Sequence, residues 1–273
     1  MAMSKRKRAQ VFRWIQYGIL VVIVLLVAIL ADWGRLAATF FSVDDAAAMF
    51  PEVITVGLKN TVVYTASGFA LGLALGLVLA LMRLSSVAPY RWISGLYIEL
   101  FRGLPALLVL LSIGYGIPLA FPGTFLDKYT AVMLGLGIVS SAYIAETRRA
   151  GIQAVPKGQV EAARSLGMST TRTTFTIVIP QAFKIILPPL TNELIMLTKD
   201  SSLAYVLGAS LLELELTQMA RQEMNSAQSL TPFVVAGLGY LVLTIPLSYL
   251  SRYLERRTGG VKISTPESTE VKA

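Results

Sequence analysis

The sequence contains no cysteine and no histidine among its 273 residues. Their absence removes disulfide bonds, thiolate and imidazole chemistry, and the commonest zinc ligands. The sequence also has no Gly-x-x-x-x-Gly-Lys-Ser/Thr phosphate-binding loop, so we do not expect this chain to hydrolyse ATP itself. A membrane-embedded enzyme would need another nucleophile and base, and the sequence offers no such set. We therefore expect no catalytic residues, no metal site and no cofactor.

Charged residues are also few. They make up 15% of the chain, against roughly 25% in soluble domains, while 55% of the residues are hydrophobic. Together with a mean hydropathy of +0.65, this composition predicts an all-α membrane protein with several spans. The 24 basic residues exceed the 16 acidic ones, which in a soluble protein would suggest nucleic acid. Here they cluster beside apolar runs, so we expect contact with membrane lipid and none with nucleic acid.

Six apolar runs have about the length that a bilayer requires. They cover residues 14–31, 54–83, 92–119, 129–147, 180–197 and 232–250. We therefore predict about six transmembrane helices. The first run follows a basic segment, as in a signal peptide, but residues 32–35 lack the small side chains of a cleavage site. We expect this first helix to be retained.

The basic residues predict the orientation of these spans. They gather in residues 5–13, 83–91, 148–172 and 252–262. The positive-inside rule places all four groups, and hence both termini, in the cytoplasm. The chain then divides into a basic tail with an added helix and an outer connection (1–52), a membrane core (53–258) and a disordered cytoplasmic tail (259–273).

Glycine and proline interrupt the third span near its start, at Gly103 and Pro105. Just before this break, Glu99 and Arg102 lie three residues apart on one helical face, so an ion pair between them is feasible. Structural pairing or snorkelling to the membrane interface is the alternative to a role in function.

The second and fifth spans contain the other small or rigid residues. Gly68, Gly72 and Gly76 form a stripe that permits close helix approach, and we favour packing within one subunit over a dedicated dimer seam. In the fifth span, the Pro188-Pro189 pair is expected to kink or interrupt the helix.

Two regions near the ends of the spans contain polar or charged residues. Glu146 can pair with Arg149 one turn later, as an anchor for the segment that follows. Residues 199–229 mix polar side chains with the amphipathic run 211–216. We interpret them as an outer re-entrant or interfacial segment.

A polar segment, residues 156–180, separates the fourth and fifth apolar runs. Pro156 offers a helix start, and residues 157–166 are expected to form that helix. Gly167 can adopt the left-handed conformation that ends it, and Ser169 can cap a second short helix. A loop of this length between membrane spans folds on itself or serves something outside the membrane.

The spacing in this segment resembles the EAA signature of permease subunits of bacterial ABC importers. The matching residues are Glu161, Ala162, Ala163, Gly167, Ile177, Ile179 and Pro180. Flanking segments resemble the polar amino-acid branch of that family; they are residues 101–105, 142–146, 157–159, 199–203 and 254–257. The resemblance covers roughly residues 54–257, and the ordered set is specific where Glu-Ala-Ala alone is not.

This resemblance implies the transmembrane subunit of an ATP-driven importer in the bacterial inner membrane, carrying an amino acid, with a polar one favoured. The family core has five spans, so residues 14–31 would be an added helix. The implied partners are a second permease subunit, identical or paralogous, two separate ATPase subunits and an extracytoplasmic solute-binding protein. The residues implied in ATPase coupling are Gly158, Glu161, Ala162, Ala163 and Gly167.

Polar residues inside the spans are candidates for the substrate pathway. Counting about 1.5 Å per residue from Pro180 places Asn192 and Glu193 near mid-bilayer, with Lys199 and Asp200 toward the outer face. A zwitterionic amino acid needs a cation and an anion partner, which these four residues could supply. Structural bonding between helices is the alternative. Further residues with a structural or pathway role are Glu99, Arg102 and Glu146.

Two positions depart from the pattern of the polar amino-acid branch, which usually has threonine at Leu104 and glutamine at Val109. Both residues are apolar here, which leaves the substrate open. The alternative function is an ion-coupled secondary amino-acid carrier acting alone, with Glu193 and Asp200 as the coupling carboxylates. Uptake driven by an ion gradient without any ATPase would support that alternative.

Overall fold

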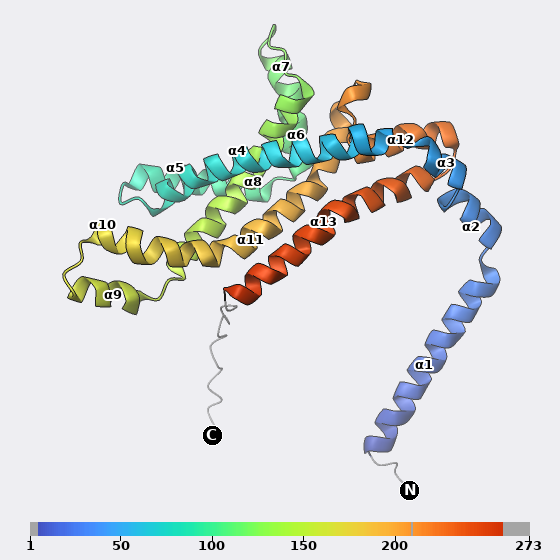
Figure 1. Cartoon of the computed structure of the whole chain (residues 1–273), viewed down its shortest axis with the longest axis horizontal. Coiled ribbons are helices and arrows are strands. Elements are labelled where there is room, and N and C mark those ends of the chain that lie inside the picture. Colours follow the sequence, from blue (N-terminus) through green and yellow to red (C-terminus); the bar gives the residue numbers. More distant parts are fainter. Residues whose placement is uncertain (1–4, 209, 259–273) are drawn as a thin grey trace.

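A computed structural model describes residues 5–208 and 210–258 of the chain, and no β-strand occurs among them. Its long helices are α1 (Lys5–Leu30), α4 (Lys59–Leu84), α8 (Lys128–Gln153), α11 (Ile179–Asp200) and α13 (Thr231–Arg257). Helices α4, α8, α11 and α13 form the bundle, while α1 stands apart from it (Figure 1). The expected disordered tail, 259–273, lies outside the described residues.

Five helices of the described chain are long and apolar enough to cross a membrane. A sixth span is obtained when α5 (Ala88–Gly103) is joined to the helical residues 106–120, which include α6 (Ala106–Leu111) and α7 (Ile117–Ala120). The two halves meet at 106°. The break falls where Gly103 and Pro105 predict it, because proline disfavours a helical residue before it. The all-α membrane architecture is confirmed.

The bundle is centred on the contact between α4 and α8, where the glycine stripe of α4 faces its neighbour. A Cβ atom added at Gly72 would lie 2.1 Å from the hydroxyl oxygen of Ser140, and one at Gly76 would lie 2.9 Å from a methyl of Ile144. Only glycine permits this approach. The stripe therefore serves packing within one subunit, as favoured from the sequence.

Helix α11 continues through Pro188 and Pro189 without interruption. The two prolines remove the backbone donors that would bond the Lys184 and Ile185 carbonyls, yet the helix resumes immediately. Membrane helices tolerate internal proline in this way because neighbouring helices and Thr side chains satisfy the freed backbone. Of the two outcomes expected for this pair, a kink or an interruption, the interruption does not occur.

The segment after α11 folds back onto the bundle. Residues 201–207 form a 3₁₀ turn, and α12 (Leu216–Ala227) packs against α13 and the π-helical residues 53–58 that precede α4. This end of the bundle also holds α2 (Trp33–Phe40) and α3 (Val43–Ala48).

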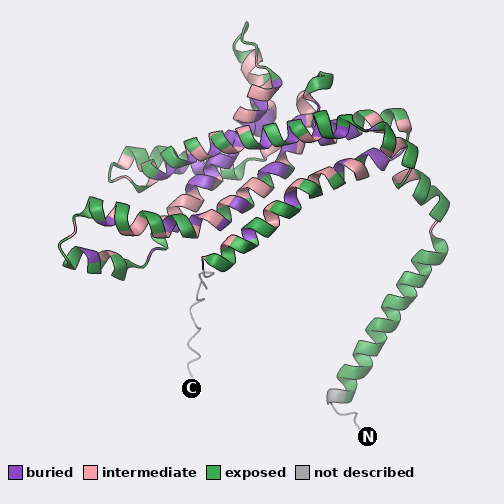
Figure 2. Ribbon diagram, viewed as in Figure 1, coloured by how far each residue is buried: buried purple, intermediate pink, exposed green. Residues whose placement is uncertain are grey.

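The connection after α1 is tied to the start of α13. The Leu230 amide donates to the Thr39 carbonyl at 2.7 Å, and Ser229 Oγ donates to Asp45 Oδ2 at 2.6 Å. By contrast, no residue in the apolar part of α1 is buried (Figure 2). Helix α1 is thus attached through its connection and makes no core of its own.

Candidate functional site

The polar segment between α8 and α11 folds as a short helix–turn–helix. Helix α9 (Lys157–Ser165) begins directly after Pro156, which takes the cap position and not the first helical position expected for it. Gly167 has φ +81°, the left-handed conformation predicted for it. Ser169 Oγ then accepts from the Arg172 amide at 3.3 Å and caps α10 (Thr170–Thr173).

Helix α9 exposes most of its signature residues to solvent. Glu161 and Ala162 are exposed, and a side chain at Gly158 would meet no atom within 4 Å. Within α9, Ala163 alone is buried, at 3% exposure. Leu166 is 85% exposed. This leucine was not among the predicted residues, although an apolar side chain beside a helix-ending glycine is a signal that could have found it.

The base of this segment is firmly packed. Val155, Ala182 and Ile186 form a buried cluster between the end of α8 and the start of α11. A Cβ atom at Gly151 would lie 2.2 Å from a side-chain carbon of Ile186, so the two helices touch there. Gln181 Nε2 also donates to Gln159 Oε1 at 3.4 Å. The base of the segment is therefore anchored to both spans.

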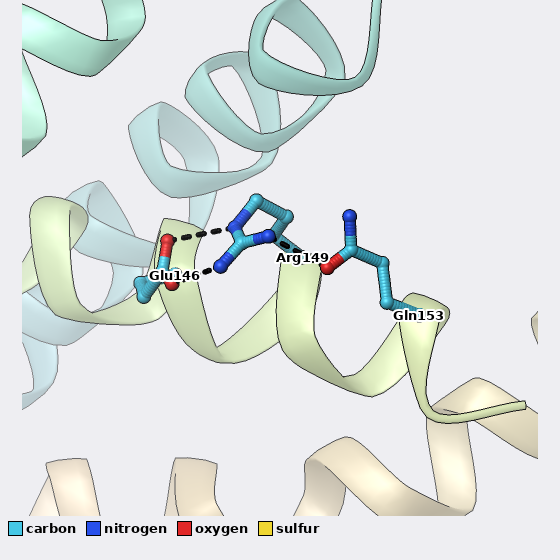
Figure 3. A network of polar contacts seen from close by, with 3 residues as sticks. All are labelled: Glu146, Arg149 and Gln153. Atoms are coloured by element: carbon cyan, nitrogen blue, oxygen red, sulfur yellow. Dashed lines mark hydrogen bonds and ion pairs between the residues drawn. The ribbon is translucent and has the colours of Figure 1, made fainter.

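The end of α8 carries the predicted pair of Glu146 and Arg149. Arg149 Nε donates to Glu146 Oε2 at 2.9 Å, a second donor reaches the other carboxylate oxygen, and Nη1 donates to Gln153 Oε1 at 2.6 Å (Figure 3). A bidentate guanidinium–carboxylate pair fixes both side chains. It locks the last turns of α8 where the polar segment begins.

A cavity of about 250 Å³ opens between the break in the third span, α8 and α11. Glu193 and Asp200 both line it from α11, together with Tyr143 of α8. Leu104 lines it as well, whereas Val109 is buried against Ile113 and Val139. Of the two departures from the family pattern, only Leu104 thus faces this cavity.

The other predicted pathway residues occupy different places. Asn192 Oδ1 accepts from Ser251 Oγ of α13 at 2.9 Å, and Asn192 and Glu193 line a second cavity of about 340 Å³. Glu193 therefore borders both cavities. Lys199 is exposed and lines neither of them. The structure brings Glu193 and Asp200 together, adds Asn192 as a neighbour, and leaves Lys199 outside.

The feasible ion pair between Glu99 and Arg102 is not formed. Glu99 is exposed, and within the part of the chain that the structure describes, the ion pairs do not include either residue. The Arg102 guanidinium instead lies 5.5 Å from the ring centre of Tyr143, whose hydroxyl donates to the Arg102 carbonyl at 3.3 Å. A contact with the aromatic face on α8 replaces the helical neighbour.

Sequence reasoning missed a buried polar network around Glu215, the residue before α12. Glu215 has 0% exposure and accepts from the amides of Thr217 and Gln218 at 2.6 and 2.7 Å and from Tyr240 Oη at 2.9 Å. Burial raises the pKa of Glu215, and these hydrogen bonds oppose the shift. Lys128 is also buried and donates to Gln218 Oε1.

Asn60 extends the same network from α4. Its Nδ2 donates to the carbonyls of Leu212 and Leu214 at 2.8 and 2.9 Å, and its Oδ1 accepts from Tyr129 Oη at 2.9 Å. The alternating Leu–Glu pattern of residues 211–216 signalled an amphipathic segment, but the partners lie on three other helices. We call Asn60, Lys128, Glu215, Gln218 and Tyr240 the buried polar network.

The chain thus combines a bundle of long apolar helices with a compact polar helix pair that lies between two of the spans. The family described as "Binding-protein-dependent transport system inner membrane component" matches residues 72–260. The chain belongs to this family.

Individual relatives support the same family assignment. The chain is similar to the probable glutamine ABC transporter permease protein GlnM of Bacillus subtilis (39% identity over 216 residues, 78% of this chain and 94% of the relative). It is also similar to the arginine transport system permease protein ArtQ of the same organism (36% identity, 78% and 96%). A crystal structure of an amino acid ABC transporter with histidines shares 38% identity and a TM-score of 0.70, covering 77% of this chain and 96% of that one.

The chain is therefore a transmembrane permease subunit of an ABC transporter. This assignment favours the ABC reading over the ion-coupled carrier that the sequence left open.

Proposed function

We propose that this chain carries an amino acid inward across the bacterial inner membrane, powered by separate ATPase subunits that bind α9. The observation that carries the proposal is the exposed face of α9, where Glu161 and Leu166 lie free while the base of the segment is packed into α8 and α11. A helix exposed in this way, yet joined rigidly to two spans, suits a lever for an external motor. The named relatives that transport glutamine and arginine support an amino acid as the substrate.

The assembly we propose contains two permease subunits, a dimer of ATPase subunits and an extracytoplasmic solute-binding protein. Closure of the ATPase dimer pushes α9, and the contact between Gly151 and Ile186 passes the movement to α8 and α11. In this arrangement both termini lie in the cytoplasm, because basic residues favour that side. Reporter fusions at Lys5 and after Lys262 would both score cytoplasmic.

We propose that the substrate passes the cavity between the third span, α8 and α11. Glu193 and Asp200 supply anions for the substrate ammonium group, and polar groups within a membrane span usually serve transport. Asn192, held by Ser251, keeps α13 beside this passage. Lys199 and Glu99 do not line the cavity, and Arg102 reaches it only through its contact with Tyr143. All three have structural roles in this proposal.

The experiment reconstitutes the permease in liposomes with and without its ATPase and solute-binding protein. We expect amino-acid uptake only with all components and ATP. Glu193→Gln should lower uptake about tenfold, the effect of losing roughly one charge-assisted contact, while basal ATP hydrolysis persists. Uptake by the permease alone, driven by an ion gradient, would contradict the proposal. Normal uptake by Glu193→Gln would remove this residue from the pathway and leave the lever in place.

A further inference from the structure

Two adjacent arginines at the end of α8 have very different surroundings. Arg149 has its carboxylate, Glu146, and an amide acceptor, Gln153 (Figure 3). Arg148 is half-buried, and its one hydrogen bond within the described chain runs from Nη1 to the Leu73 carbonyl at 2.6 Å. The described ion pairs do not include Arg148. A guanidinium in a membrane span without a counter-charge is costly, so an anion from outside the chain is expected beside it.

Arg148 opens into a groove between α4, α8 and α11. The groove has a volume of about 260 Å³, and Arg148 is its sole charged residue. The other lining residues are apolar: Leu77, Ala80, Leu81, Ile152, Ile179, Ala182, Phe183, Ile186 and Leu190. Four of them, Leu77, Leu81, Ile179 and Phe183, are among the exposed large hydrophobic side chains. An apolar channel with one cation matches a molecule that has an acyl chain and an anionic head.

We propose that this groove binds an anionic phospholipid of the inner leaflet, with its phosphate on Arg148 and an acyl chain along Leu77, Leu81 and Phe183. The leaflet follows from the proposed orientation of the spans. Arg148 lies five residues before the end of α8 at Gln153, about 8 Å along the helix axis. A long arginine side chain and local thinning of the bilayer can bring a phosphate to this depth.

The site would also affect coupling, because its walls include the two ends of the polar segment. Ile152 precedes α9 by five residues, and Ile179 begins α11. Ala182 and Ile186 belong both to the groove and to the buried cluster at the base of that segment. A bound lipid would fill the space between α4 and this base. It would make the lever stiffer without touching the ATPase.

The test measures lipid retained by the assembled permease–ATPase complex. Wild type is placed in nanodiscs of phosphatidylcholine and phosphatidylglycerol in equal parts, released, and analysed by native mass spectrometry for bound phosphatidylglycerol. We expect Arg148→Gln to reduce retention about tenfold, as loss of a charge-assisted contact implies. Arg148→Lys should retain most of it. Lys184→Gln is the matched control, since Lys184 is an exposed basic residue on α11 outside the groove.

A second variant, Leu81→Trp, changes the acyl channel at an exposed position and leaves the arginine intact. It should also lower retention. Added inorganic phosphate should not displace the lipid, because it has no acyl chain. Equal retention by wild type and Arg148→Gln, or no retained phosphatidylglycerol in wild type, would overturn the proposal. So would loss of permease dimers in Arg148→Gln, which would assign the groove to a second copy of the chain. ATP-dependent uptake measured in parallel keeps the proposed function separately testable.

Discussion

Helices α12 and α9 are both short amphipathic helices outside the spans, and they are held in opposite ways. The start of α12 is satisfied by its own chain, since Glu215 accepts from two amides and from Tyr240. Helix α9 buries only Ala163 and leaves Glu161 exposed. Helix α12 is thus held by contacts within the chain, whereas α9 leaves most of its surface exposed.

This contrast separates residues that stabilise the fold from residues that we propose contact the ATPase. Damage to the buried polar network should lower the stability of the permease itself. Damage to α9 should leave the permease folded and harm only assembly or coupling. The variants below test this separation.

The largest effect is expected from Glu215→Leu. The change leaves the Tyr240 hydroxyl and two amides without their acceptor in a buried site, and the loss should be about 4 kcal/mol in the free energy of unfolding. Thermal unfolding of the purified permease in detergent measures it. Glu223→Gln on the same helix is the control and should change stability little. A stable Glu215→Leu would show that α12 does not depend on the buried polar network.

Glu161→Lys comes next and should act only in the complex. An exposed carboxylate contributes little to the permease alone, but reversing a charge at a proposed protein contact should cost about 3 kcal/mol of ATPase binding. Co-purification with the ATPase and thermal unfolding of the isolated permease measure the two quantities. A drop in permease stability without a change in ATPase binding would show that Glu161 stabilises the permease fold and does not contact the ATPase.

Gly167→Val is expected to strain the turn after α9. A β-branched residue at φ +81° should cost about 1–2 kcal/mol and tilt the helix away from its direction. The variant should insert and bind ATPase weakly, with ATP hydrolysis no longer coupled to uptake. Gly158→Ala, where a side chain meets no atom within 4 Å, is the matched control. Coupled transport by Gly167→Val would show that the direction of α9 does not affect the coupling of ATP hydrolysis to uptake.

The smallest effect is a pH dependence from Glu215. Burial raises the pKa of this carboxyl above its usual 4.5, so the folded state binds a proton more tightly than the unfolded state. Its contribution is therefore present at low pH and is lost as pH rises from 4.5 through the raised pKa. The melting temperature should fall over that window, and Glu215→Gln should remove this component. An unchanged slope in the variant would assign the effect to other groups.

The spans and the turn at Gly167 could be predicted because they depend on local composition and residue type. Burial of Glu215 could not, since Tyr240 lies on α13 and its approach is set by the packing of α12 on that helix. Local rules also failed for one feature, an ion pair in the third span. The spacing of Glu99 and Arg102 permitted an ion pair, but Tyr143 on a neighbouring helix offered the arginine another contact.

In the candidate site, too, the features set by local sequence could be predicted, and those set by the packing of helices could not. The signature on α9 was readable, because a contiguous motif needs no tertiary information. Of the four residues proposed for the pathway, Glu193 and Asp200 line this cavity and Lys199 does not, because side-chain direction on α11 depends on helix packing. Their role in transport stays a prediction. Arg148 gave no sequence signal beyond a basic span end, and only its separation from Glu146 and its groove distinguish it from Arg149.

Hydrogen exchange of the backbone amides tests the central contrast most directly. The purified permease and the permease–ATPase complex are compared under identical conditions. We predict that the amides of α12, Leu216–Ala227, exchange slowly in both samples, because the chain itself holds this helix. The amides of α9, Lys157–Ser165, should exchange fast in the permease alone and slow markedly in the complex. Equal protection of α9 in both samples, or protection of α12 only in the complex, would contradict the account.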